Sequence, residues 1–160
     1  MKENGHRDEH FLRKAIDLAE ESAQGGGGPF GALVVKDDRI VAEGTNRVTA
    51  GNDPTAHAEI VAIRRACEAL DDFQLAGCTL YASCEPCPMC LGAIYWARPE
   101  RVIYAAPHAD ATRAGFDDSM IYDEIDRPPA ERRLPMRQLL REEAQRPFRA
   151  WADNEERVAY

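Results

Sequence analysis

Two short fragments bring metal-binding and proton-transferring side chains together in the sequence. The first is His57-Ala58-Glu59, and the second contains two thiols separated by two residues, Cys87 and Cys90. Thiolates and imidazole nitrogens are ligands that zinc prefers in proteins. Because Pro88 suits the first position of a helix, the thiol pair lies at a predicted helix start, where the helix dipole favours thiolates. We therefore predict that His57, Cys87 and Cys90 hold one Zn2+ in each chain.

Three protein ligands leave one coordination position open, as in catalytic rather than structural zinc sites. Two thiolates formally cancel the charge of the ion, so such a site acidifies water weakly and needs a nearby base. Glu59 stands two residues after His57. Helical side chains tilt toward the N-terminus, so both can converge on a target beyond the helix tip. With Thr55 as the predicted N-cap, we expect the zinc between two helix N-termini.

Each of these residues also has an ordinary structural explanation. A lone His on a helix is usually exposed or part of the core, and a Glu in a first helical turn usually complements the dipole. A Cys pair with two intervening residues also occurs in redox dithiols and in structural zinc sites. A non-catalytic structural zinc or redox module is thus the alternative from another class. Glu59 argues against it, because a closed structural site needs no proton carrier.

The elements that position these fragments alternate between helices and strands. Apolar residues at helical spacing and β-rich runs predict helices over 8–24, 57–70 and 88–97 and strands over 30–36, 39–45, 79–83 and 101–106. The first two strands form an antiparallel hairpin, and the later crossovers predict parallel strands. The helix over 88–97 is apolar nearly all round, so we expect it to be buried.

The remaining segments give weaker patterns. After Pro107 we expect a polar loop, a short helix over 118–125, a strand or helix over 134–140, and a closing helix over 146–156. The glycine run 25–28 lacks the Lys and Ser or Thr of a phosphate-binding loop and is interpreted as a flexible connection. Cys84 is interpreted as a small buried hydrophobe and His108 as a surface residue.

Composition limits the class of partner. The chain has 160 residues, a net charge of -8 and five cysteines. An acidic chain is a poor match for a polyanion, so we expect a small-molecule substrate and no nucleic acid. No apolar stretch resembles a signal peptide or reaches membrane-spanning length, so we expect no membrane partner. Because the cysteine count is odd and no stretch resembles a signal peptide, we expect reduced thiols and a cytoplasmic location.

The zinc fragments resemble those of a known superfamily. His57-Ala58-Glu59 followed by Pro86-Cys87-Pro88-Met89-Cys90 resembles the zinc nucleobase and nucleoside deaminases of the cytidine-deaminase type. The resemblance implies a single α/β domain over residues 1–160, with a three-layer α/β/α fold and a mixed five-stranded sheet. It also implies hydrolytic deamination, in which Glu59 takes a proton from water, protonates the ring nitrogen and helps ammonia leave.

Within that superfamily, four further stretches resemble the small bacterial guanine deaminases: residues 28–32, 52–59, 83–98 and 114–119. This resemblance implies that guanine is converted to xanthine and ammonia. It assigns a purine hydrogen bond to Asn46, stacking to Phe30, contact with the guanine edge and assistance in proton transfer to Asp118, and closure of the pocket to Tyr160. It also implies a homodimer in which segments from about residue 128 to 160 are exchanged.

The chemistry of guanine also favours a carboxylate contact, because N1–H and the exocyclic amine are adjacent donors and a carboxylate can accept hydrogen bonds from both. Whether Asp117 or Asp118 faces the purine depends on local geometry, and only the resemblance selects Asp118. Without the resemblance, Phe30 would be a core residue, Asn46 a turn residue and Asp118 a helix start.

Several related activities share the zinc residues. A tRNA adenosine deaminase must bind a polyanion, against which the net charge of -8 argues. Cytosine, guanosine and aminotriazine deaminases would differ only in the walls of the pocket, so the zinc fragments leave these alternatives open.

Overall fold

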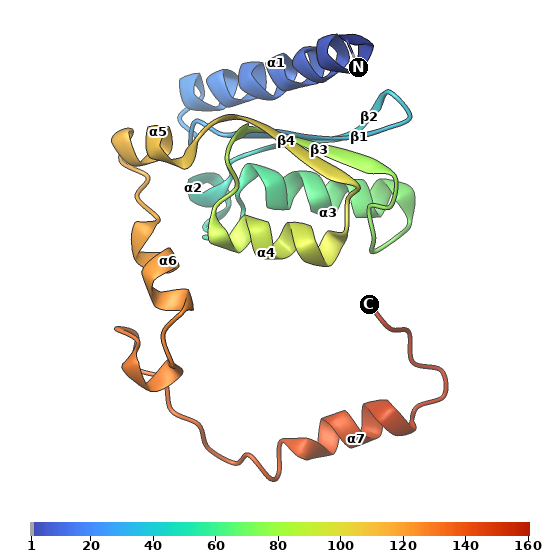
Figure 1. Ribbon diagram of the computed structural model, residues 1–160, viewed down its shortest axis with the longest axis vertical. Helices are drawn as coiled ribbons and strands as arrows, with labels where there is room; N and C mark the ends of the chain where they lie inside the picture. Colours follow the sequence, from blue (N-terminus) through green and yellow to red (C-terminus); the bar gives the residue numbers. More distant parts are fainter. Residues whose placement is uncertain (1) are drawn as a thin grey trace. The chain divides into compact units, whose positions relative to one another are not determined.

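The computed structural model describes residues 2–160, with side chains from residue 5 onward. Contacts within the chain divide it into two compact units, Met1–Asp118 and Ser119–Tyr160. The first unit contains α1 (Lys2–Gln24), β1 (Gly31–Lys36), β2 (Arg39–Thr45), α2 (Val48–Gly51), α3 (Ala58–Leu70), β3 (Cys78–Cys84), α4 (Pro88–Ala97), β4 (Arg101–Ala106) and α5 (His108–Arg113) (Figure 1). The helices and strands predicted before residue 107 are confirmed, and α2 and α5 are additional.

The strands of the described residues form one four-stranded sheet in the order β2-β1-β3-β4. β1 is antiparallel to both β2 and β3, and β3 is parallel to β4, as the hairpin and the crossover predict. The expected fifth strand is wrong for this chain: residues 134–140 form neither strand nor helix. Pro135 has no amide hydrogen for a strand ladder. The backbone of Leu140 has a φ of 56°, outside the extended region.

Helices cover both faces of the sheet, α1 on one side and α3 and α4 on the other (Figure 1). The alternation along β1 follows this layering. Leu33 and Val35 are buried in the cluster that includes residues of α1, whereas Ala32 and Val34 are buried with residues of α3 and α4. The three-layer arrangement implied by the resemblance is therefore present.

Two glycines permit the close approach of a helix to the sheet. A Cβ on Gly31 would collide with the backbone of Ala15 and Ala19 in α1, and one on Gly44 would collide with the backbone of Ala58 and Ala62 in α3. This close packing fixes α3, and therefore its N-terminus, against β2.

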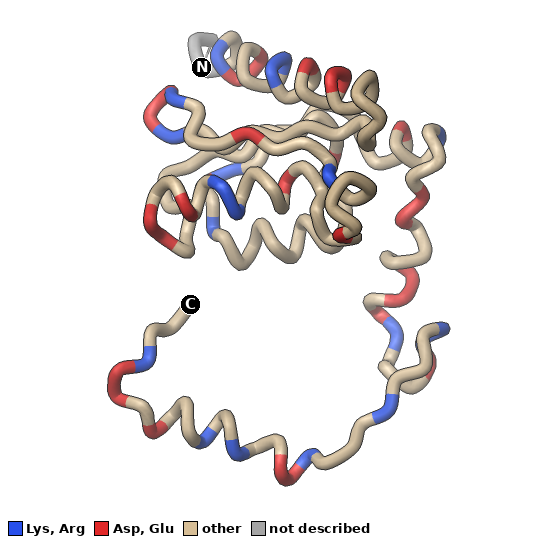
Figure 2. The backbone as a smooth tube through the Cα atoms, turned by 180° about the vertical axis from the view of Figure 1, so that it is seen from behind, with Lys and Arg blue, Asp and Glu red and all other residues tan. Residues whose placement is uncertain are grey.

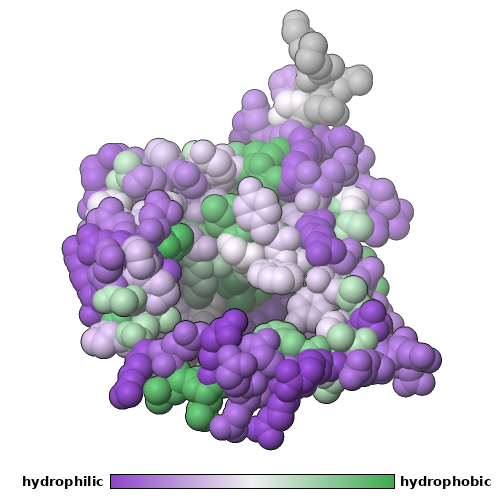
Figure 3. Space-filling view, turned by 60° about the horizontal axis from the view of Figure 1, so that its bottom comes forward, coloured by the Kyte–Doolittle hydropathy of each residue, from purple (hydrophilic) through white to green (hydrophobic). Residues whose placement is uncertain are grey.

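The expectation that α4 is buried is wrong. Its buried residues are Cys90, Ile94 and Ala97, which lie on one stripe at helical spacing. Tyr95 and Trp96, on the other faces, are 75% and 64% exposed. The apolar composition of α4 therefore comes from two faces: one is buried, and the other is exposed to solvent. Figure 3 shows apolar residues, in green, that interrupt the hydrophilic surface of the face in view.

An ionic network ties α1 to the sheet. Asp8 accepts hydrogen bonds from the buried Tyr81 hydroxyl at 2.6 Å and from Arg101 at 2.8 and 2.9 Å. Burial alone would raise the pKa of the Asp8 carboxyl, but the hydrogen bonds from Arg101 and Tyr81 hold it below its ordinary value. Along the rest of α1, short groups of acidic and basic residues alternate (Figure 2).

The second unit contains α6 (Ser119–Ile125), the 3-10 helix η1 (Pro129–Glu131) and α7 (Gln145–Asp153). The two helices predicted for this region are confirmed within a few residues. Arg132 donates to the carbonyl oxygens of Glu124 and Arg127, which holds η1 against the end of α6. Phe148 and Val158 in this unit are 68% and 63% exposed. Among the described residues, no helix is both long and apolar enough to cross a bilayer.

Candidate active site

The three predicted metal ligands converge in the first unit. The Nδ1 atom of His57 lies 3.5 Å from the Sγ atoms of both Cys87 and Cys90. The three ligand atoms all lie within 4.8 Å of one another. Glu59 lies in the first turn of α3, two residues after His57, and is only 8% exposed.

These distances fit a tetrahedral zinc ion. Ordinary zinc–sulfur and zinc–nitrogen bond lengths at a tetrahedral angle separate the two ligand atoms by about 3.6 Å. The observed separations of 3.5 Å between His57 and each sulfur meet that requirement. Two thiolates and one imidazole are a zinc donor set, so the residues present fit the ion.

Two helix N-termini hold the ligands. His57 is the N-cap of α3 and Cys87 is the N-cap of α4, where its Sγ accepts a hydrogen bond from the Cys90 amide. The prediction of a site between two helix N-termini is confirmed, but Thr55 is not the N-cap. The Thr55 hydroxyl instead donates to Asp53 at 2.7 Å within the preceding loop.

Hydrogen bonding polarises the ligand group. The hydrogen bond with the Cys90 thiol lowers the pKa of Cys87 to about 4, and the same bond raises the pKa of Cys90. The hydrogen bond between His57 and Cys87 raises the pKa of the His57 imidazole. Binding of a metal ion would displace the thiol protons, since metal ligands bind as thiolates. Burial raises the pKa of the neighbouring Glu59 carboxyl.

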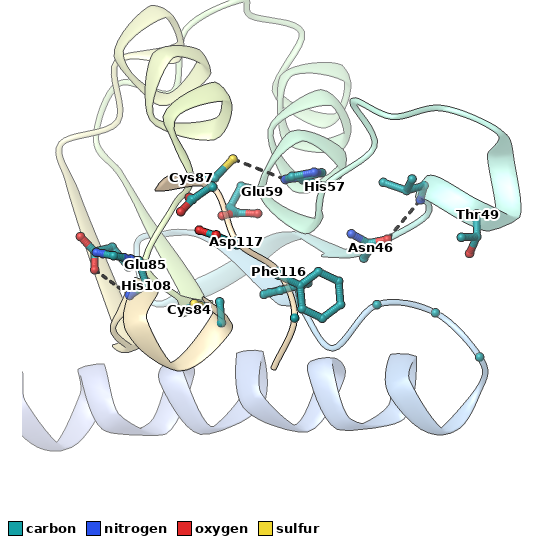
Figure 4. Close-up of a pocket in the computed structure, with 18 residues that line it drawn as sticks. Asn46, Thr49, His57, Glu59, Cys84, Glu85, Cys87, His108, Phe116 and Asp117 are labelled. Carbon is teal, nitrogen blue, oxygen red and sulfur yellow. Dashed lines mark hydrogen bonds between the residues drawn. The ribbon is translucent and has the colours of Figure 1, made fainter. Parts of the chain in front are cut away.

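A cavity of about 570 Å3 opens beside this group (Figure 4). Its lining includes most of the residues that the sequence analysis assigns to a site: Phe30, Asn46, His57, Glu59, Cys87, Asp117 and Asp118. Cys90 is completely buried behind it. Tyr160 belongs to the second unit, where it is 70% exposed, and its role at a site stays a prediction.

The carboxamide of Asn46 is oriented by its surroundings. Its Oδ1 accepts a hydrogen bond from the Val48 amide at 3.2 Å, which leaves Nδ2 as the donor end. A Cβ on Gly28 would lie 2.9 Å from Cγ of Asn46, so only glycine leaves room for this packing. The glycine run therefore forms a wall of the cavity, a role beyond the flexible connection inferred from sequence.

Aromatic rings form another wall. The ring centroids of Phe30 and Phe116 are 4.9 Å apart, in an edge-to-face arrangement. Phe116 comes from the segment after α5, so this contact joins that segment to the start of β1.

Both candidate carboxylates reach the cavity. Asp117 and Asp118 line it together with Glu59. Oδ1 of Asp118 is buried and has no hydrogen-bond partner among the described residues. A buried acceptor without a partner is costly, so this atom suits an N–H donor from a bound molecule.

Sequence reasoning missed much of the lining, namely Gly26, Gly27, Gly28, Val48, Thr49, Cys84, Glu85, His108, Ala111, Gly115 and Phe116. Five of these residues lie inside the stretches that carry the resemblance, which was the available signal: Gly28, Cys84, Glu85, Gly115 and Phe116. Cys84 is half-buried rather than part of the core, and burial raises its pKa to about 11. His108 is exposed as expected, but it lines the cavity.

Comparison with known families decides between the remaining interpretations of the zinc group. The model of the cytidine and deoxycytidylate deaminase zinc-binding region matches residues 6–106. This match covers more than half of the chain and contains all three ligands and Glu59. The chain belongs to this deaminase family. Membership excludes the non-catalytic redox or structural module and makes zinc the metal of the site.

Two relatives within the deaminase family differ in how much they share with this chain. A guanine deaminase of Bacillus subtilis is 61% identical over 144 residues, covering 89% of this chain and 92% of the relative. A tRNA-specific adenosine deaminase of Agrobacterium fabrum is 44% identical over 108 residues, covering 66% of this chain and 71% of the relative. Similarity to the first therefore extends into the C-terminal region.

A solved deaminase structure has the same fold. The X-ray structure of guanine deaminase from Bacillus subtilis aligns with a TM-score of 0.93 at 58% identity, covering 95% of this chain and 98% of that one.

Proposed function

We propose that this protein is a zinc-dependent guanine deaminase, which converts guanine and water into xanthine and ammonia. The observation that carries the proposal is the cavity in which the zinc ligands His57 and Cys87, the proton carrier Glu59 and the buried acceptor Asp118 meet. The extent of similarity to a guanine deaminase supports guanine as the substrate.

His57, Cys87 and Cys90 would hold the zinc ion, which would supply Lewis-acid activation of water. The Glu59 carboxylate accepts a proton from that water and delivers it to the ring nitrogen beside the carbon under attack. It then takes the remaining proton of the added hydroxyl group and passes it to the exocyclic amine, which leaves as ammonia. One water is consumed, and the carbon–nitrogen bond to the amine is replaced by a carbon–oxygen bond.

Three other lining residues suit a purine. Oδ1 of Asp118 accepts from the adjacent N–H donors of guanine, which satisfies its missing hydrogen bond. Asn46 presents Nδ2, because the Val48 amide occupies its oxygen, and so donates to an acceptor of the purine. Phe30 offers its ring for stacking while Phe116 supports it edge-on.

We further propose that the protein is a homodimer in which segments from about residue 128 to 160 are exchanged, so that Tyr160 covers the partner's cavity. Two sets of exposed apolar side chains support an interface. Leu91 and Tyr95 of α4 are exposed in the first unit, and Phe148 and Val158 are exposed in the second. Covering the cavity would exclude water and strengthen polar contacts to guanine.

A substrate panel tests the function. We expect the zinc-loaded protein to release ammonia from guanine and to release far less from guanosine, adenine, cytosine or a tRNA anticodon stem-loop. Preferred turnover of the tRNA fragment would instead make the chain a nucleic-acid deaminase. Preference for cytosine or guanosine would retain the reaction and reject the substrate.

A further inference from the structure

Glu85 links the turn between β3 and α4, which carries the zinc ligand Cys87, to the end of β4 and the start of α5. Its Oε2 accepts a hydrogen bond from the His108 amide at 2.9 Å (Figure 4). Its own amide donates to the Ala106 carbonyl oxygen at 2.8 Å. Glu85 lies two residues before the zinc ligand Cys87. Glu85 therefore joins the turn before Cys87 to the end of β4 through its backbone and to the start of α5 through its side chain.

The carboxylate occupies the position of a helix cap. His108 is the first residue of α5, and the N-cap, Pro107, has no side chain able to accept the first free amides. An anionic acceptor at that end is stabilising because the helix dipole is positive there. Glu85, from elsewhere in the chain, supplies the missing acceptor.

The other end of α5 determines the path to Asp118. The Phe116 amide donates to the Ala111 carbonyl oxygen at 2.9 Å, and the Gly115 amide donates to Thr112 at 3.0 Å. Gly115 has a φ of 98°, a conformation that glycine adopts without strain. Three residues after Gly115 the chain reaches Asp118, whose Oδ1 is buried and has no hydrogen-bond partner among the described residues. Displacement of α5 would therefore move Asp118.

We propose that Glu85 is a positioning residue for guanine deamination: it fixes α5 to the zinc turn and thereby sets the distance between Asp118 and the reacting centre. This inference rests on the proposed function. Glu85 itself accepts a hydrogen bond from the His108 amide, and its effect on the purine is transmitted through Asp118.

Replacing His108 tests the hydrogen bond without altering Glu85. Proline is accepted at the first position of a helix, and the extended backbone of Pro107, with ψ of 160°, suits a residue that precedes proline. His108→Pro therefore deletes the amide donor, whereas His108→Ala removes the same side chain and keeps the donor. We expect kcat/KM for guanine to be about tenfold lower in His108→Pro than in His108→Ala, since a charge-assisted hydrogen bond is lost. Equal values would overturn the proposal.

Replacing Glu85 gives a second, independent measurement. Glu85→Ala should lower kcat/KM by about the same factor, mainly through KM, while Glu85→Gln, which retains a carbonyl acceptor, should restore most of it. In an Asp118→Asn background, Glu85→Ala should have little further effect, because both changes remove the same contact. Additive losses would make Glu85 act independently of Asp118 and overturn the proposal, as would loss of zinc from Glu85→Ala.

A binding measurement separates this inference from the proposed function. In a Glu59→Gln background, guanine binds without turnover, and its dissociation constant should be weakened about tenfold by His108→Pro relative to His108→Ala. If the parent protein neither binds nor deaminates guanine, the proposed function fails. If it does both and the His108 pair is identical, only the positioning role fails.

Discussion

Nδ1 of His57 lies 3.5 Å from Sγ of Cys87, although 30 residues separate them in the sequence. Each residue is the N-cap of its own helix, α3 for His57 and α4 for Cys87. The fold thus brings two helix N-termini to one point, where negative ligands are stabilised by both dipoles.

Loss of a sulfur ligand should release the metal. We expect Cys87→Ser and Cys90→Ser to lose most of their zinc and their activity, because zinc prefers thiolate and the remaining ligands are too few. Cys67→Ser is the matched control, since Cys67 packs against the core and is not part of the ligand group. Elemental analysis by mass spectrometry gives the zinc content of each chain. Full zinc occupancy in both ligand variants would reject the assignment.

The metal ligands and most elements were predictable because they depend on local patterns. The spacing of Cys87, Pro88 and Cys90 specifies both the ligands and the start of α4, which begins at the predicted residue. The cavity walls were less accessible to prediction. The path of the chain after α5, and so the burial of Asp118, depends on contacts such as that between Glu85 and His108, which join distant residues.

Two errors have physical causes in the same sequence. The apolar composition of α4 predicts burial, but composition alone does not separate a core helix from one with an exposed apolar face such as that of Tyr95. The fifth strand rested on resemblance alone, and residues 134–140, for which a strand or a helix is predicted, contain Pro135 and form neither.

Asp118→Asn should damage guanine turnover more than Asp117→Asn. The amide presents a donor toward the N–H groups of guanine, and a lost or mispaired buried contact costs about 1–3 kcal/mol, or roughly 5- to 150-fold in kcat/KM. Melting temperatures of both variants control for folding. A larger loss in Asp117→Asn would give the purine contact to Asp117, and equal kinetics in Asp118→Asn and the parent would remove Asp118 from the site.

The Tyr81–Asp8 hydrogen bond should make stability depend on pH in the alkaline range. Burial and the bond to Asp8 raise the pKa of Tyr81 from 10.0 to about 12. The stabilisation, about 2–3 kcal/mol, is therefore complete below pH 10 and is lost as the pH rises through 12. Urea unfolding across this range should show a decline that Tyr81→Phe removes. Tyr104→Phe, on the neighbouring strand, should keep the decline, and a Tyr81→Phe protein with the same decline would refute this origin.

Removal of residues 154–160 should leave a folded, zinc-loaded protein with strongly reduced guanine deamination. If the segments are exchanged, a mixed dimer of a Glu59→Gln chain and a truncated chain has both defects in one site and none in the other. Such mixtures should recover up to about half of the parental activity per mixed dimer. Subunit exchange is verified by native mass spectrometry. With exchange verified, an absence of recovery means that the segment does not cover the partner's cavity.

The origin of the oxygen in xanthine tests the central claim most directly. Guanine is incubated with the zinc-loaded protein in oxygen-18 water, and xanthine and ammonia are measured together. We predict equal amounts of both products, one oxygen-18 atom in each xanthine, and turnover reduced at least about 100-fold in Glu59→Gln despite full zinc occupancy. Xanthine without the label, or undiminished turnover in zinc-loaded Glu59→Gln, would contradict a hydrolysis in which Glu59 carries the protons.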